Sequence, residues 1–152
     1  EITMLTGTQQ MMDSGRKGTV IYPLNRNVGE NMEIQHLAMQ IRTTDLDGSI
    51  AFYTERLGFT LAFRYEDFYA GVDCGVHRLH LKLVDETDPS IAFVRAGEHL
   101  HLHIMIDELA STFQRLQQEG VQVIEAPAKR PWGTTEFVIE DPDGHTIYFA
   151  QA

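Results

Sequence analysis

The segment DLDGSIAFYTERLGF, residues 45–59, has the clearest pattern in this chain. Four apolar residues recur in it at the spacing of one helix face: Leu46, Ile50, Tyr53 and Leu57. Asp45 precedes them, where a short side-chain oxygen can accept a backbone N–H of the first turn. Gly58 follows them, where a left-handed helix stop costs least. We therefore predict an amphipathic helix over 46–57 with one buried face.

The elements around this helix follow an order that the second half of the chain repeats. Alternation of apolar and polar residues predicts strands at 34–42, 59–65, 68–74 and 78–84, followed by a polar turn at 85–90. The second half predicts a strand at 99–106, a helix from Leu109 to Gly120, and strands near 121–125, 135–140 and 145–150. The chain therefore reads as two βαβββ modules, at about 34–90 and 97–152.

A single module of this kind has one curved sheet with one helix outside it, and it cannot bury both faces of the sheet alone. Two modules side by side can wrap their sheets around a cavity. We therefore predict an α+β fold in which paired βαβββ modules form an open, barrel-like curved sheet with the helices outside. Polar residues on the inner face then become candidates for function.

Residues 1–31 differ from the rest, because Gly, Gln, Thr, Ser and Met dominate much of this stretch and no clear period runs through it. We predict an N-terminal extension or tag-like segment there, with an edge strand at 19–22, and a single domain over 32–152.

Composition excludes several classes of protein. The chain has 152 residues, 43% of them hydrophobic, which is enough for a real core. Its net charge of −10 argues against nucleic acid or an anionic membrane as the main partner. One cysteine, Cys74, excludes an internal disulfide, and no secretory signal or membrane-length apolar run is visible. We expect a cytoplasmic protein.

Two motifs carry a resemblance to a known family. Residues 45–59 resemble the first-helix signature of the glyoxalase/bleomycin-resistance/dioxygenase family, the vicinal oxygen chelate superfamily. The C-terminal stretch PWG at 131–133, Phe137 and DPDGH at 141–145 resemble the final hairpin of that family. The resemblance covers about 34–152. It implies paired βαβββ modules around a cleft, commonly in a homodimer, that either hold a divalent metal or bind a drug or metabolite without one.

The resemblance also assigns positions to metal ligands, and these positions are Ala38, His80 or Lys82, His101 and Tyr148. Alanine offers no donor atom, an ammonium group cannot ligate, and a phenol is a poor ligand at neutral pH. His36 lies on the same strand face as Ala38 and is an alternative ligand in a shifted place. A catalytic ion needs at least three converging donors. We therefore predict no metal ligands and no cofactor, with a divalent metal kept for the alternative function below.

The predicted ligand-binding residues are His101, His80, Tyr148, Trp132 and His103, and no catalytic residue is assigned. His99, His101 and His103 alternate and so share one face of a strand. Trp132 offers a flat surface for stacking, although an ordinary hydrophobic plug is an equal interpretation. Tyr148 can donate a hydrogen bond to a ligand oxygen or to a neighbour in the strand.

Two further groups have simpler explanations. Core packing is the favoured interpretation of four aromatic residues near one hairpin, although a pocket lining or a dimer contact is also open: Phe63, Tyr65, Phe68 and Tyr69. Glu140, Asp141 and Asp143 are best explained as turn residues whose side chains bind local N–H groups.

The sequence therefore favours a metal-independent small-molecule-binding protein of the drug- or metabolite-sequestering kind, working as a homodimer. The alternative is a divalent-metal-dependent lyase, isomerase or thiol transferase of the glyoxalase type. A third hypothesis is a dimeric interaction module whose own side chains fill the cavity. A measurement of bound metal distinguishes the first two hypotheses. A structure that shows whether side chains of the protein fill the cavity tests the third.

Overall fold

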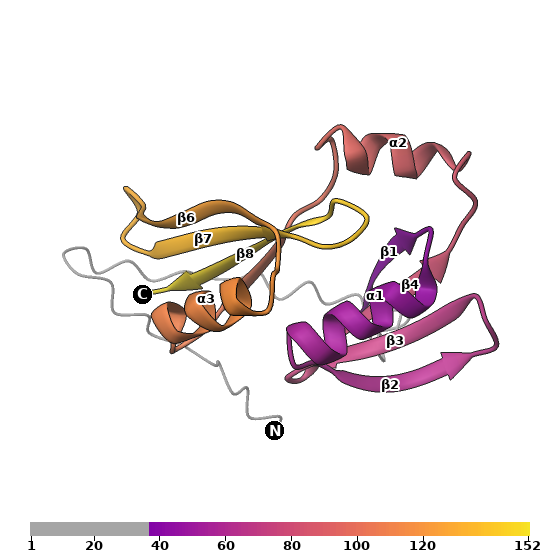
Figure 1. The fold of residues 1–152 in the computed structure, drawn as a ribbon, viewed down its shortest axis with the longest axis horizontal. Helices are drawn as coiled ribbons and strands as arrows, with labels where there is room; N and C mark the ends of the chain where they lie inside the picture. The colour runs from indigo at the N-terminus through magenta and orange to yellow at the C-terminus, as the bar shows by residue number, and fades with distance from the viewer. Residues whose placement is uncertain (1–36) are drawn as a thin grey trace, which may run out of the picture. The chain divides into compact units, whose positions relative to one another are not determined.

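The computed structural model describes residues 37–152, whose helices and strands form two successive βαβββ modules (Figure 1). The first module consists of β1 (Met39–Thr43), α1 (Leu46–Ala51), the π-helical turn η1 (Phe52–Arg56), β2 (Thr60–Tyr65), β3 (Tyr69–Cys74) and β4 (His77–Leu83). The second consists of β5 (Leu102–Met105), α3 (Leu109–Gln118), β6 (Val123–Lys129), β7 (Thr135–Glu140) and β8 (Thr146–Gln151). Helix α2 (Pro89–Arg95) connects them.

Each module builds one four-stranded sheet, and the strand orders β1-β4-β3-β2 and β5-β8-β7-β6 are equivalent. In both sheets the first and last strands of the module pair in parallel, and the other neighbours are antiparallel. The predicted internal repeat and the α+β class of paired βαβββ modules are confirmed.

The first helix begins and ends where the sequence indicates. An oxygen of the Asp45 carboxylate accepts a 3.0 Å hydrogen bond from the backbone N–H of Gly48, and Gly58 adopts a φ of 76° just beyond the helix. The last turn widens into η1, where the N–H of Leu57 donates to the carbonyl of Phe52. This turn ends the helix with the Tyr53 ring fully buried.

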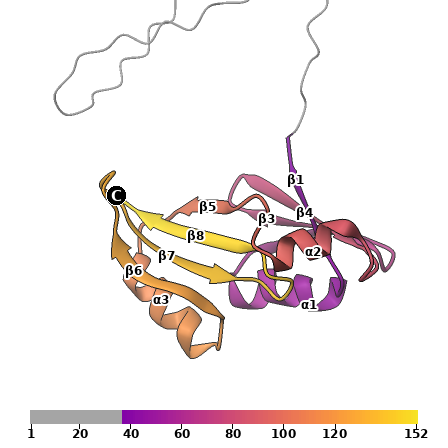
Figure 2. The same ribbon diagram turned by 90° about the horizontal axis from the view of Figure 1, so that it is seen from above.

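The core lies between each helix and one face of its sheet, and Figure 2 shows α1 and α3 lying along the sheets of their own modules. In β4, Leu79 and Leu81 are buried in this core, so His80 between them lies on the opposite face. In β8, Ile147 and Phe149 are buried and Tyr148 lies opposite. The face without a helix is therefore the one that carries the predicted site residues.

One helix of the structure was not predicted. The polar turn was expected at 85–90, but its last two residues belong to α2, which begins at Pro89 and is capped by Asp88 through a 2.9 Å hydrogen bond from the N–H of Ser90. Aspartate and proline are typical of turns, but they also form the ordinary start of a helix. None of the helices within residues 37–152 has both the length and the apolar character needed to cross a membrane.

Some predictions lie outside the described residues. These are the extension at 1–31, the strand at 19–22, the first residues of the strand expected at 34–42, and His36.

Candidate functional site

On the second module, three of the predicted site residues lie close together on the face opposite α3. His103 of β5 pairs with Tyr148 of β8, and the ring of His101 meets that of Tyr148 edge-on with 5.5 Å between centroids. The Nδ1 atom of His101 is hydrogen-bonded to the hydroxyl of Thr146. This bond fixes the ring of an otherwise exposed histidine and leaves its Nε2 atom for another partner.

Trp132 and His103 both contact Glu136, a residue that the sequence analysis did not single out. The indole N–H of Trp132 donates a 2.9 Å hydrogen bond to Glu136 Oε1, and Nε2 of His103 lies 3.5 Å from the same oxygen. The Trp132 residue is nevertheless 69% exposed, which contradicts its interpretation as a hydrophobic plug. The indole is thus held at its edge while much of its surface faces solvent.

The Glu136 residue is only 3% exposed, and its carboxylate is surrounded by hydrogen-bond donors. Besides Trp132, the Thr134 hydroxyl donates to it at 2.6 Å and the Arg130 guanidinium at 3.2 Å. The hydrogen bond from Thr134, followed by those from Trp132, His103 and Arg130, lowers the pKa of Glu136 to about 2 despite burial. The sequence signal was strand alternation, which places Glu136 on the face of Val138 and Tyr148.

His99, the first of the alternating histidines, connects the exposed His101 with the buried interior of the module. His99 has its ring 5.1 Å from that of His101 and 5.7 Å from that of the buried His145. Nδ1 of His99 lies 2.7 Å from the carbonyl oxygen of Leu100, so this nitrogen carries the proton that is donated. The predicted common face of His99 and His101 is therefore borne out by their ring contact.

On the first module, His80 belongs to a polar line that crosses the sheet. Its Nδ1 atom lies 2.8 Å from the hydroxyl of Tyr69, and the side-chain amide of Gln40 donates to the same hydroxyl at 3.0 Å. Gln40 and His80 are register partners in the parallel β1–β4 pair. Three strands thus contribute one residue each.

An aromatic ring covers this line from β2. The Phe63 ring packs edge-on against His80, with 5.4 Å between centroids, and lies over Gly71. A Cβ atom at residue 71 would stand 2.3 Å from the ring, so glycine is what permits the close approach. The Arg78 guanidinium lies 5.8 Å from the ring centroid and is held by Asp73.

The outer end of the same hairpin does not form core. Tyr65 is 59% exposed and Phe68 is 45% exposed, so core packing was the wrong interpretation for these two residues. Their rings contact each other with 5.5 Å between centroids. A pocket lining or a contact between copies remains as the prediction for them.

A groove of about 670 Å³ runs between β5 and the first module. It is lined mainly by apolar residues, which include Met39, Phe59, Leu102, Ile104 and Met105, together with the β3–β4 turn and the start of β4, residues 74–79. His103 is the predicted site residue that reaches it. The groove has the size of a small-molecule site.

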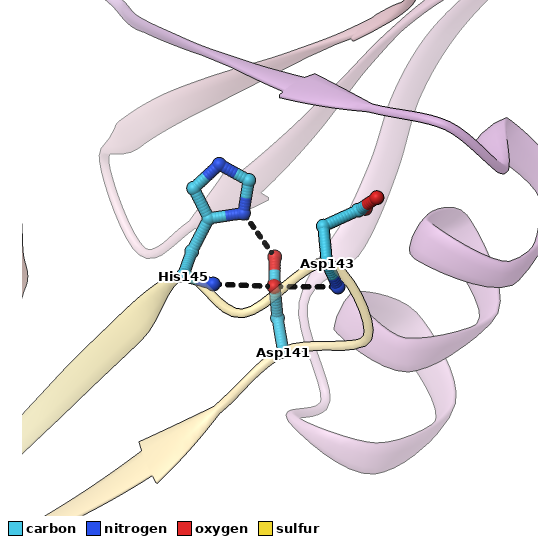
Figure 3. Close-up of side chains that lie close together, drawn as sticks. All are labelled: Asp141, Asp143 and His145. Carbon is cyan, nitrogen blue, oxygen red and sulfur yellow. Dashed lines mark hydrogen bonds and ion pairs between the residues drawn. The ribbon is translucent and has the colours of Figure 1, made fainter. Parts of the chain in front are cut away.

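A trio of potential cation ligands lies in the β7–β8 turn, where Asp141, Asp143 and His145 are all buried (Figure 3). One Asp141 oxygen accepts from the backbone N–H groups of Asp143 and His145, and the other from the Tyr53 hydroxyl at 2.8 Å and from His145 Nδ1 at 2.9 Å. The prediction of local turn bonding holds for Asp141.

Asp143 bonds across to the first module instead. One of its oxygens accepts from the backbone N–H and the hydroxyl of Thr44, and the other from the hydroxyl of Ser49 at 3.2 Å. Each carboxylate oxygen of the trio therefore accepts a hydrogen bond from a protein donor. A cation at this place would compete with these donors for the same carboxylate oxygens, so the turn is better suited to holding α1 in place than to holding an ion.

The structure thus places four of the predicted residues in the second module: His103 and Tyr148 on its sheet, His101 just before β5, and Trp132 in the loop between β6 and β7. His80 lies on the sheet of the first module, where its ring contacts are with Phe63 and Tyr69.

Comparison with known proteins identifies the class to which this protein belongs. Residues 33–149 match the model of the Glyoxalase/Bleomycin resistance protein/Dioxygenase superfamily, and the chain belongs to this superfamily.

Relatives within the superfamily differ in function. A protein from Synechocystis described as a probable lactoylglutathione lyase is 29% identical over 129 residues, which cover 76% of this chain and 93% of that protein. A bleomycin resistance determinant encoded on transposon Tn5 superposes with a TM-score of 0.62 at 25% identity, covering 78% of this chain and 98% of the other. A bleomycin-binding protein in complex with bleomycin superposes at 0.61 with 24% identity over 78% and 99% of the two chains. The last likeness concerns the fold alone.

Proposed function

We propose that this protein binds a small organic molecule without a metal ion, in the manner of a drug- or metabolite-sequestering protein. The observation that carries the proposal is the exposed indole of Trp132, whose N–H is held by the buried carboxylate of Glu136. A flat aromatic surface that is already fixed loses little side-chain entropy when a ligand stacks on it. Such a surface suits an aromatic or cationic ligand.

The neighbouring residues supply the polar contacts in this proposal. His101, His103 and Tyr148 lie on the same module, with one nitrogen of His101 already bound to Thr146. Their remaining nitrogen and hydroxyl atoms orient the polar groups of the ligand, while apolar walls remove its surface from water. His80 contributes from the sheet of the first module.

The residues at the metal positions of the superfamily do not fit a divalent ion. Ala38 has no donor atom, and Tyr148 has a phenol where a carboxylate would serve better. His80 and His101 each use Nδ1 in a hydrogen bond to a hydroxyl group of the protein, so each could offer one nitrogen at most, and two donors are fewer than the three that a catalytic ion needs. The proposed binding of the ligand therefore involves no metal.

The proposal includes a homodimer, because the open faces of the two modules differ in charge. On the first module, Arg42, Arg78 and Lys82 share the face of His80 by strand alternation. On the second module, Glu125, Glu136 and Glu140 lie beside Tyr148 or its neighbours on the sheet. Opposite charges would attract the first-module face of one copy to the second-module face of another, and several exposed apolar residues would be covered.

The test uses the one tryptophan of the chain, whose fluorescence reports on this site when it is excited at wavelengths that the five tyrosines do not absorb. The protein is titrated with flat aromatic compounds with and without positive charge, and with bleomycin, because a structural neighbour binds it. We expect saturable changes in fluorescence and a rise in melting temperature for some of these compounds.

A matched pair of variants locates the binding. Trp132→Leu should weaken binding by at least about tenfold in melting-shift titrations, since a central aromatic contact is lost. Phe93→Leu removes an exposed aromatic residue of α2 that has no part in the proposed site, and it should bind normally. Equal affinities in both variants, or no binding by any compound in the panel, would reject the proposal.

A second candidate is a lyase of the glyoxalase type, which the curated relatives favour. It predicts a stoichiometric divalent metal in the purified protein and loss of that metal in His101→Ala. Protein with no bound nickel, zinc or manganese after purification in the presence of these metals would reject this candidate.

A further inference from the structure

In the second module, one buried charge lies directly beside the exposed tryptophan. Glu136 is 3% exposed, and its Oε1 atom accepts the indole N–H of Trp132 at 2.9 Å. An indole N–H points along the plane of its ring, so the carboxylate lies at the edge of the ring and this hydrogen bond covers neither face. Trp132 therefore offers its exposed surface next to a fixed negative charge that a ligand need not touch.

This carboxylate keeps its charge at neutral pH. The pKa of Glu136 is lowered to about 2 by hydrogen bonds from Thr134 first, and then from Trp132, His103 and Arg130. A proton therefore does not neutralise the group under ordinary conditions.

The guanidinium of Arg130 compensates only part of the negative charge. It binds Oε2 of Glu136 at 3.2 Å, whereas Oε1 accepts from the neutral hydroxyl of Thr134 at 2.6 Å. Arg130 also binds the carboxylate of Glu125 at 2.8 Å. Two carboxylates thus share one guanidinium, and this network keeps a net charge of −1 with its histidine neutral.

The neighbouring lysine does not offset this charge on the same face of the sheet. Lys129 pairs with Thr135, while Ala128 pairs with Glu136. Because successive side chains of a strand point to opposite faces, Lys129 and Glu136 lie on different faces. The indole therefore lies in a negative local field.

We infer that the site at Trp132 prefers organic cations with a flat aromatic ring over neutral and anionic rings of the same shape, and that Glu136 is the positioning residue that sets this preference. The face of an aromatic ring attracts cations through its quadrupole. A fixed negative charge at the edge of the indole adds to this attraction and opposes the approach of an anion. The inference rests on the proposed function and names the class of ligand for its site.

Three probes of similar size test this preference at pH 8: N-methylquinolinium, which is cationic, quinoline, which is neutral, and 2-naphthoate, which is anionic. The chain has one tryptophan, so a labelled sample gives one indole ¹H–¹⁵N signal, which reports contacts of Trp132 during each titration. We expect N-methylquinolinium to bind at least about fivefold more tightly than quinoline, and 2-naphthoate to bind most weakly.

Two substitutions of Glu136 separate its charge from a purely structural role. Glu136→Gln removes the charge, while its amide oxygen can still accept the indole N–H. In this variant the cation should lose most of its advantage, and the affinity for quinoline should stay within about twofold of the wild type. Glu136→Asp keeps the charge and should keep the preference for the cation.

A matched control removes an equal charge elsewhere on the same strand. Glu140 lies four residues after Glu136 in β7, which corresponds to about 13 Å along an extended strand. Glu140→Gln should therefore keep the wild-type ratio of the two affinities.

Equal affinities of the wild type for N-methylquinolinium and quinoline would overturn the inference, and this measurement needs no variant. An unchanged ratio in Glu136→Gln would overturn the role of Glu136, and so would a parallel loss of both affinities, which would indicate a structural role. Binding of all three probes with one affinity would leave the proposed function standing and reject the preference for cations. No response of the indole signal to these probes or to the ligand panel would reject the proposed function and the inference together.

Discussion

The hydroxyl of Tyr53 donates a 2.8 Å hydrogen bond to the carboxylate of Asp141, 88 residues further along the chain. Both side chains are buried, and they join the first helix of one module to the last turn of the other. Burial and the nearby Asp141 raise the pKa of Tyr53 well above its ordinary value, so the hydroxyl keeps its proton and remains a donor. The two motifs of the sequence thus meet in one hydrogen bond.

We predict that Tyr53→Phe lowers the free energy of unfolding by about 1–3 kcal/mol, because a buried carboxylate loses a donor while the ring volume is kept. Urea denaturation measures the change. Tyr65→Phe removes a hydroxyl from an exposed ring and should change stability by less than about 0.5 kcal/mol. Equal effects in the two variants would show that the contact with Asp141 has no special importance.

The buried trio in the β7–β8 turn leads to a prediction about ions. Since each oxygen of Asp141 and Asp143 already accepts from protein donors, calcium or manganese at millimolar concentration should leave the melting temperature unchanged. Chelation with EDTA should have no effect either. A rise in melting temperature that depends on calcium or manganese and is absent in Asp143→Asn would contradict this account of the turn.

The fold was largely predictable from the sequence because the helix of each module and most strands have strong periods of their own. The stripe from Leu46 to Leu57 and the Asp45 cap are local features, so the first helix could be predicted without knowledge of its tertiary contacts. Helix α2 escaped prediction because Asp88 and Pro89 are as typical of a turn as of a helix start. The separation of the strands into two sheets depends on long-range pairing, which periodicity does not report.

The candidate site was predictable only in part, because the contacts between its strands are long-range and periodicity does not report them. His101 and Tyr148 were assigned through the resemblance, and their strand positions bring the rings together. Glu136 was missed because its role depends on Trp132, which lies across a turn, and on His103 in another strand. A lone carboxylate in a strand gives no sign of such partners before the sheet order is known.

We predict that Gly71→Ala displaces the ring of Phe63, since the new methyl group would stand 2.3 Å from it. The expected loss of stability is about 1–3 kcal/mol, typical of overpacking. The same substitution made in a Phe63→Leu background should cost less, because the edge of the ring is gone. Additive effects in this double-mutant cycle, measured by urea denaturation, would show that the ring and Gly71 do not interact.

The low pKa of Glu136, about 2 against an ordinary value of 4.5, predicts how stability depends on pH. The folded state favours the ionised carboxylate, so its contribution is fully present above about pH 4.5 and is lost as the pH falls towards 2. Glu136→Gln removes this titration, and its unfolding midpoint in urea should therefore fall less steeply than that of the wild type over this interval. The fluorescence of Trp132 should change together with the protonation of Glu136, because the carboxylate accepts the indole N–H. Glu98→Gln removes an exposed carboxylate and should follow the wild-type curve. If Glu136→Gln and the wild type lost stability in parallel down to pH 2, the carboxylate would not be ionised in the folded state at low pH, and the fixed orientation of Trp132 would need another cause.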